Sequence, residues 1–331
     1  MKAVYSLLIY LLLIGLVIIG VSGAGLDYLF AVVIPYCAIA LFLVGFVYRI
    51  IGWARSPVPF RIPTTCGQQK TLPWIKTNRL DNPHSALGTI GRMALEIFFF
   101  RSLFRNTRVN LRNDQKLVYG SNKWLWLGGL AFHWSFLIIF IRHLRFFIEP
   151  VPYFITLAEQ LDGFFQVGVP VILITDIIIV AAVTYLFLRR VFDSQLRYIS
   201  LPADYFPLFL ILGIVVTGIL MRYFYKTDIV AIKELAMGLI SFRPVVANDI
   251  SAMFYIHLAS VSVLFAYFPF SKLMHLGGVF LSPTRNLANN NRMKRHVNPW
   301  DYPVKVHTYE EYEDEFRDVM KAAGMPLDKE S

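Results

Sequence analysis

Six long apolar stretches constrain the fold of this chain more than any other feature of the sequence. They are Val4–Val21, Tyr28–Tyr48, Trp124–Ile148, Val167–Leu188, Tyr205–Tyr223 and Ala252–Leu276. Each is close to the roughly 20 apolar residues that a helix needs to cross a bilayer. The chain is 56% hydrophobic and 16% charged, whereas soluble domains carry about a quarter charged residues. The sequence therefore predicts an all-α integral membrane protein with six transmembrane helices.

Positive charge is concentrated in one loop. Residues Arg49–Lys123 hold 13 Lys and Arg and three acidic residues, a surplus equal to the net charge of +10 of the whole chain. By contrast, Phe146–Gln166 contains neither Lys nor Arg. Loops rich in Lys and Arg stay in the cytoplasm. We therefore place the basic loop, Arg189–Ala203 and both termini in the cytoplasm, with Lys226–Ser251 outside. The charge reflects topology and the lipid bilayer, not nucleic-acid binding.

The first apolar stretch has two interpretations. Lys2 precedes it, and the small residues of Val21–Ala24 would suit cleavage of a secretory signal peptide. Its apolar run is long for such a signal, however. We therefore interpret it as a retained transmembrane helix, followed by a short outer loop that ends at residue 27.

Two further helices are predicted outside the spans. Ser85–Phe104 is apolar but contains Arg92 and Arg101 and is followed by Arg105, which favours an interfacial helix under the lipid headgroups. The same segment could also form a docking surface for a cytoplasmic subunit. Tyr309–Ala323 is strongly acidic with an apolar stripe at helical spacing. It is predicted to be either a solvated helix or a partner-docking surface.

Four of the seven histidines lie inside predicted spans, where a polar side chain is costly unless it is bound. His133 and His143 are ten residues apart, a helical rise of about 15 Å, and His257 and His275 are eighteen apart, about 27 Å. Because the two helices run in opposite directions, His133 is expected at the level of His275 and His143 at the level of His257. Eighteen residues make five turns, so His257 and His275 are expected on one face of their helix. Around the other helix, His133 and His143 differ by about 80°, so the faces match imperfectly.

Two histidines at each level suit a flat macrocycle between helices. Zinc requires three or four ligands close together, which this spacing does not provide. The two cysteines, Cys37 and Cys66, form no CxxC or CxxCH motif. The sequence therefore encodes neither a covalent c-type haem nor a cysteine-ligated iron–sulfur cluster. We predict two non-covalent haem b groups.

The pairs His-x9-His and His-x17-His on antiparallel helices resemble the ligand spacing of the nitrate reductase gamma-subunit family of dihaem cytochromes b. The last five spans follow the helix order of that family, so the resemblance covers about Tyr28–Leu281, with the first span as an extra. With that extra span and the segment Gly91–Phe104, the chain is most similar to the M subunit of the sulfite-reduction-associated Dsr electron-transfer complex. The membrane subunit of heterodisulfide reductase is a close relative.

The resemblance implies roles for individual residues. His133 and His275 would bind the haem near the cytoplasmic face, and His143 and His257 the haem near the outer face. Menaquinol would bind beside the outer haem, but Glu149–Asp176 lacks the lysine that nitrate reductase uses there. The candidates for contacting haem propionates or the quinone, chosen by expected depth, are Arg142, Arg145, Arg222 and Lys226.

The resemblance also implies partners and a location. These are a cytoplasmic iron–sulfur subunit of heterodisulfide-reductase type, an outer multihaem cytochrome c and other membrane subunits, in the cell membrane of a prokaryote that respires sulfur compounds or sulfate. Residues 1–27 would form the extra helix and its loop, residues 28–281 the dihaem bundle with cytoplasmic loop 49–123, and residues 282–331 a cytoplasmic docking tail. The chain itself would at most oxidise quinol.

Asp176 and two rival functions complete these expectations. Asp176 is expected near the middle of the fourth span, where an acid is costly. It would either relay protons or bind a haem histidine, or it would bond to a neighbouring helix with help from Thr175.

A nitrate-reductase or heterodisulfide-reductase cytochrome b is the nearest alternative function. A haem-free transporter, which would be colourless, and a membrane anchor are alternatives from other classes.

Overall fold

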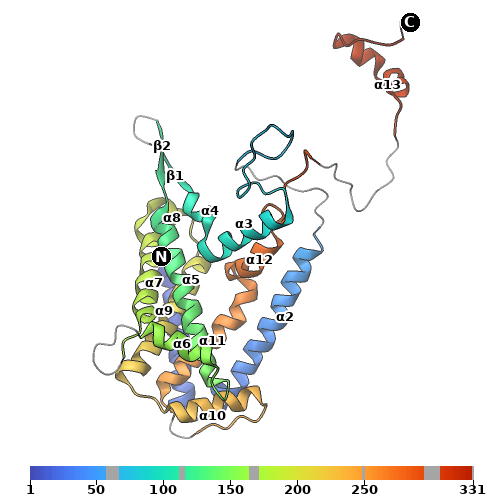
Figure 1. Ribbon diagram of the computed structural model, residues 1–331. Coiled ribbons are helices and arrows are strands. Elements are labelled where there is room, and N and C mark those ends of the chain that lie inside the picture. The colour runs from blue at the N-terminus through green and yellow to red at the C-terminus, as the bar shows by residue number, and fades with distance from the viewer. Residues whose placement is uncertain (57–66, 112–115, 164–170, 248–249, 294–305, 330–331) are drawn as a thin grey trace.

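A bundle of long helices forms the body of the protein (Figure 1). The computed structural model describes residues 1–331 apart from 57–66, 112–115, 164–170, 248–249, 294–305 and 330–331. The bundle helices are α1 (Lys2–Ile18), α2 (Ile34–Ala54), α5 (Lys123–His143), α7 (Ile174–Phe192), α9 (Pro202–Ile219) and α11 (Ala252–Tyr267). The π-helical turns that extend α1, α2 and α9 are Ile19–Gly23, Leu29–Val33 and Leu220–Phe224.

Among the described residues, five segments are long and apolar enough to cross a membrane, which confirms five of the six predicted spans. They are Lys2–Gly23, Leu29–Ala54, Lys123–Phe146, Pro202–Phe224 and Ala252–Phe270. The remaining span, predicted at Val167–Leu188, corresponds to α7. This helix begins only at Ile174 and carries Asp176, Arg189 and Arg190, and residues 167–170 lie outside the described residues. A sixth span therefore stays a prediction.

The helix contacts define how the bundle is built. Helix α11 packs against α1, α2 and α9, and α7 lies between α5 and α9. Helix α1 packs against α9 and α11, so the extra N-terminal helix is an integral part of the bundle. Tyr10 of α1 is buried there, with its hydroxyl 3.4 Å from the hydroxyl of Ser260 in α11.

Short elements cover the two ends of the bundle. Figure 1 shows α3, α4, the strands, α8 and α12 at one end and α6 and α10 at the other. The amine of Lys2 donates a hydrogen bond of 3.0 Å to the carbonyl oxygen of Tyr198, which brings the start of the chain to the first end. The bounds are α3 Ala86–Phe99, α4 Arg101–Arg105, β1 Thr107–Leu111, β2 Leu117–Ser121, α6 Tyr153–Asp162, α8 Ser194–Ile199, α10 Ile229–Ile240 and α12 His275–Leu281.

Three local features differ from or refine the predictions for the ends. The basic loop contains an antiparallel hairpin, with Thr107 opposite Ser121, in a chain predicted to be all-α. The helix predicted at Ser85–Phe104 is divided at Phe100 into α3 and α4. The predicted acidic helix is present as α13 (Tyr309–Ala322), whose N-terminus is closed by reciprocal capping bonds.

The last predicted span is not one continuous helix. Helix α11 ends at Tyr267, and two 3₁₀ turns, Phe268–Phe270 and Lys272–Met274, precede α12. Pro269 lacks a backbone N–H and disfavours an unbroken α-helix. The expectation that His257 and His275 share one face of a five-turn helix is therefore wrong, because His275 begins a separate helix.

A glycine on α9 sets how closely α1 approaches. A Cβ atom at Gly213 would collide with the ring and hydroxyl of Tyr10, whereas a Cβ at Gly15 of α1 would have nothing within 4 Å. We expect Gly213→Ala to destabilise the bundle by about 1–3 kcal/mol through overpacking. Gly15→Ala, the matched control, is expected to be neutral or stabilising by about 0.5–1 kcal/mol. Thermal unfolding in detergent measures both, and equal midpoints would contradict the close approach.

Candidate functional site: two facing histidine pairs

The first histidine pair lies toward the end of the bundle that carries α3 and α12. His133 of α5 and His275 of α12 have ring centroids 5.8 Å apart, with ring planes at 88°. The Nδ1 atom of His133 lies 2.7 Å from the carbonyl oxygen of Gly129, one turn earlier on α5. The Nδ1 atom of His275 lies 3.0 Å from the carbonyl oxygen of Lys272. The break before α12 therefore supplies the backbone oxygen that orients His275.

The second pair joins His143, at the end of α5, to His257 of α11. Their ring centroids are 6.4 Å apart and their planes differ by only 10°. The Nδ1 atom of His143 lies 2.7 Å from the carbonyl oxygen of Ile139. The Nδ1 atom of His257 lies 2.9 Å from the hydroxyl of Thr217 in α9. That hydroxyl is 2.8 Å from the carbonyl oxygen of Gly213, to which it donates.

These contacts fix the tautomer of all four rings. A backbone carbonyl oxygen only accepts hydrogen bonds, so Nδ1 of His133, His143 and His275 must carry the proton. The Thr217 hydroxyl has one proton, which goes to a backbone carbonyl, so this hydroxyl accepts from His257. In a neutral ring protonated on Nδ1, the Nε2 lone pair is free to bind a metal. Each pair therefore offers two such nitrogens.

The spacing within each pair matches two imidazoles on one metal ion. A metal–imidazole bond is about 2 Å and a ring centroid lies about 1 Å behind its nitrogen, so two opposed rings have centroids roughly 6 Å apart. The observed separations are 5.8 and 6.4 Å. His133, His143 and His275 also keep exposed ring surface in otherwise apolar segments, and His257 is partly exposed.

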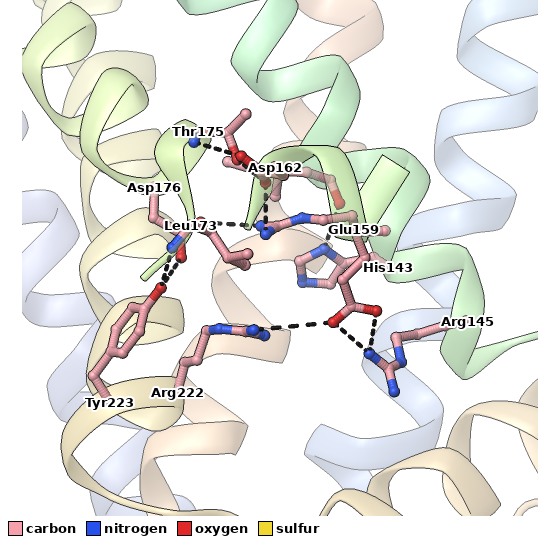
Figure 2. A network of polar contacts seen from close by, with 11 residues as sticks. His143, Arg145, Glu159, Asp162, Leu173, Thr175, Asp176, Arg222 and Tyr223 are labelled. Carbon is pink, nitrogen blue, oxygen red and sulfur yellow. Dashed lines mark hydrogen bonds and ion pairs between the residues drawn. The ribbon is translucent and has the colours of Figure 1, made fainter. Parts of the chain in front are cut away.

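A network of buried charges adjoins the second pair, as Figure 2 shows. Arg142, next to His143, reaches two carboxylates. Its Nη1 is 2.8 Å from Asp162 of α6 and its Nη2 is 3.0 Å from Asp176 of α7. The Tyr223 hydroxyl donates to Asp176 at 2.8 Å. The backbone N–H and the hydroxyl of Thr175 donate to Asp162 at 2.8 and 2.6 Å.

A second, more exposed cluster of charges lies beside this network (Figure 2). Arg145 donates to both oxygens of Glu159 at 2.8 and 2.7 Å. Arg222 approaches the same carboxylate at 3.9 Å. Three of the four predicted basic candidates therefore gather close to His143. Lys226 is exposed, in the turn before α10.

Asp176 was expected near the middle of the fourth span, and this expectation is wrong. It lies in the first turn of α7, because Leu173 is extended and the helix begins at Ile174. Its carboxylate contacts Arg142 of α5 and Tyr223, which lies in the turn after α9. Thr175 bonds Asp162 instead of assisting Asp176. These contacts favour the interpretation that Asp176 joins neighbouring helices.

Comparison with known proteins identifies the family. Residues 93–296 match the family described as the nitrate reductase gamma subunit. The chain belongs to the nitrate reductase gamma-subunit family. The matched region contains all four histidines of the two pairs. It begins within α3, so α1 and α2 precede it.

Individual relatives support the assignment to the nitrate reductase gamma-subunit family. The chain is 52% identical, over 82% of its length and 83% of the relative, to the Hdr-like menaquinol oxidoreductase cytochrome b-like subunit of Archaeoglobus fulgidus. It is 44% identical to the protein of the same name from Archaeoglobus profundus, over 81% of each chain. The nitrate reductase gamma chain of Bacillus subtilis is 24% identical over 49% of this chain and 75% of its own.

Sequence reasoning missed several polar partners within this member of the nitrate reductase gamma-subunit family. Asp162, Glu159, Thr217 and Tyr223 each bond a residue at least 13 positions away. Apolar periodicity carries no signal for such pairs. The two acids, however, stand in the loop without Lys or Arg, close to an arginine pair at the end of α5. That juxtaposition could have suggested ion pairs.

Arg142 is expected to be the most sensitive charged residue of the network. Its side chain is only 9% exposed, and its removal leaves Asp162 and Asp176 without their cation. Breaking such a buried pair costs about 3–5 kcal/mol, so Arg142→Ala should strongly lower the thermal midpoint of the protein in detergent.

Arg145→Ala is the matched control for this prediction. Arg145 lies three residues further on, but its side chain is 41% exposed and that of its partner Glu159 is 31% exposed. Exposed pairs contribute about 0–1 kcal/mol, so this variant should remain close to the parent. Losses of equal size in the two variants would show that burial of the Arg142 network has no special effect on stability.

Proposed function

We propose that this chain is the dihaem cytochrome b subunit of an Hdr-like menaquinol oxidoreductase in a prokaryotic cell membrane. Its role would be electron transfer between menaquinol at the outer face and an iron–sulfur partner of heterodisulfide-reductase type in the cytoplasm. The general role is supported by the Archaeoglobus relatives, which are named as cytochrome b-like subunits of such an oxidoreductase. The observation that carries the proposal is the pair of facing, Nδ1-protonated histidines at each of two levels.

The residues present fit two haem b groups. His133 and His275 would bind one haem iron and His143 and His257 the other, because each pair offers two imidazole nitrogens at suitable spacing. When bound, each haem supplies a one-electron redox centre. The chain orients the ligands through the Nδ1 bonds to backbone oxygens and to Thr217, which also raise the basicity of the iron-binding nitrogens.

The charge distribution supports the orientation in the membrane. Lys2, the Arg189–Ala203 loop and the basic hairpin lie at the end that carries α3, and Arg108 of the hairpin pairs with Asp193 at 3.0 Å. By the positive-inside rule this end would face the cytoplasm. The pair His133–His275 would then be the inner one and His143–His257 the outer one. The docking tail would begin at residue 282, on the inner side.

The outer charged residues would serve the quinol side of the reaction. Menaquinol oxidation releases two electrons and two protons, and polar groups must line the place where this happens. Arg142 is held between two carboxylates, so we assign it and Asp176 a structural role. Arg145, Arg222 and the exposed Lys226 would be the cations available to haem propionates or the quinone.

The similarity to the Archaeoglobus subunits also leads to a proposal for the wider complex. We propose an outer multihaem cytochrome c and further membrane subunits as partners, and a role in sulfur or sulfate respiration. The acidic helix α13 would dock a cytoplasmic subunit, because Tyr309, Tyr312, Phe316 and Val319 leave an exposed apolar stripe.

Glu313 stays charged on this helix. Burial would raise its pKa, but N–H donors of Asp328 and Lys329 and the charge of Arg317 lower it below the usual value.

Haem content tests the proposed ligands. The purified chain, expressed with adequate haem, should contain two b haems by pyridine haemochrome assay. His133→Ala and His275→Ala should each lose one haem, and His143→Ala and His257→Ala should each lose the other. Because one pair of rings is perpendicular and the other nearly parallel, the two ferric haems should give different low-spin electron paramagnetic resonance signals.

His307→Ala is the control for the haem count. His307 lies outside the bundle, near α13, where its ring faces Glu315 at 3.9 Å, so this variant should keep both haems. A chain without haem, or four histidine variants that all keep two haems, would refute the dihaem assignment. Such a result would favour the haem-free transporter or the membrane anchor instead.

Arg222 offers a test of the quinol side. Its side chain is 39% exposed and its guanidinium lies over the Tyr223 ring, next to the outer histidine pair. Arg222→Leu should raise the KM for reduction of the protein by menadiol several-fold while leaving the haem count unchanged. Arg243→Leu, which removes an exposed cation after α10, should leave the KM unaltered. Equal KM values in both variants would exclude Arg222 from quinol binding.

A further inference from the structure

Phe100 adopts a backbone conformation that a phenylalanine rarely takes. It ends α3 with φ 50° and ψ 47°, in the left-handed region. Helices often end with such a residue, but it is usually glycine, because a Cβ atom is strained there. Glycine would satisfy this turn at a lower cost in free energy. What Phe100 adds to the turn is its phenyl ring.

Neighbouring contacts hold the strained turn in place. The carboxylate of Glu96, which is buried, accepts hydrogen bonds from the backbone N–H and the hydroxyl of Ser102. The indole N–H of Trp126 in α5 donates to the carbonyl oxygen of Phe99 at 2.7 Å. The indole N–H of Trp134 donates to the carbonyl oxygen of Phe98 at 3.0 Å. The end of α3 is therefore anchored to the same helix that carries His133.

The ring of Phe100 lies against His133. The two centroids are 4.9 Å apart and the planes make an angle of 85°. Phe132 makes a matching contact, at 5.0 Å and 84°. Edge-to-face contacts of this kind fix the orientation of a ring. Together with the Nδ1 bond to Gly129, they leave the plane of His133 little freedom to rotate.

We propose that Phe100 is a positioning residue that sets the ring plane of His133 and thereby the ligand field of the inner haem. The inference rests on the proposed function, in which His133 binds haem iron. The turn between α3 and α4 would act on the redox centre through the phenyl ring of Phe100. Strained non-glycine residues persist where the surrounding structure holds them, and they cluster at functional sites.

The angle between the two ligand planes gives this proposal a spectroscopic signature. His133 and His275 are nearly perpendicular, at 88°. The g-values of a ferric haem with two histidine ligands depend on the angle between their planes. Rotation of His133 would therefore shift the low-spin signal of the inner haem and leave the signal of His143 and His257 in place.

Two substitutions at Phe100 distinguish the effect of its phenyl ring from the effect of its strained backbone. Phe100→Gly removes the ring and relieves the backbone, whereas Phe100→Leu removes the ring and keeps a strained side chain in the turn. Both variants, as full-length protein in lipid nanodiscs, should keep two haems and show a shifted inner low-spin signal with an unchanged outer one. Phe99→Ala, the control, removes a neighbouring ring that is 56% exposed, and its spectrum should match the parent.

The outcomes distinguish this proposal from the one on which it rests. If Phe100→Gly and Phe100→Leu change the thermal midpoint but not the inner signal, Phe100 only fills space and the positioning role is overturned. If Phe99→Ala shifts the inner signal as much as they do, the effect is not specific to Phe100 and the role is again overturned. If the parent chain binds no haem, the proposed function itself fails, and the haem assay shows this before any variant is compared.

Discussion

An imidazole among apolar helices must direct both ring nitrogens to partners within the protein, and this constraint organises the bundle. Three of the four rings donate Nδ1–H to a carbonyl oxygen three or four residues earlier in the chain, and His257 donates to Thr217 on α9. Each donation needs no water and leaves the lone pair of Nε2 available to a metal. The two ring pairs and the bond to Thr217 connect α5, α9, α11 and α12.

The charged network at the other end has a different physical basis. Arg142 joins α5 to α6 and α7 through Asp162 and Asp176, and Tyr223 adds the turn after α9. Buried ion pairs add little net stability, because desolvation of the charges opposes their attraction. In the observed arrangement of the four segments, Arg142 faces both carboxylates and Tyr223 reaches Asp176. The network therefore fixes where α6 crosses the end of the bundle beside His143.

The sequence predicted spans and histidines because both have strong local signals: apolar runs of membrane length and polar rings inside them. It did not predict the break at Pro269, although a proline within a helical pattern is itself a signal. The hairpin that pairs Thr107 with Ser121 and the bond from His257 to Thr217 depend on contacts between distant segments. The position of Asp176 was misjudged because the apolar run continues before the helix begins.

The packing of α1 also has a consequence for biosynthesis. Tyr10 and its partner Ser260 are separated by 250 residues. At typical rates of 5–20 residues per second, a ribosome needs roughly 10–50 s to make that intervening chain. During this interval α11 has not yet been made, so α1 lacks the helix face that it later contacts. Helix α1 is thus made long before it can reach the face of α11 that it contacts, and assembly depends on the delay being tolerated.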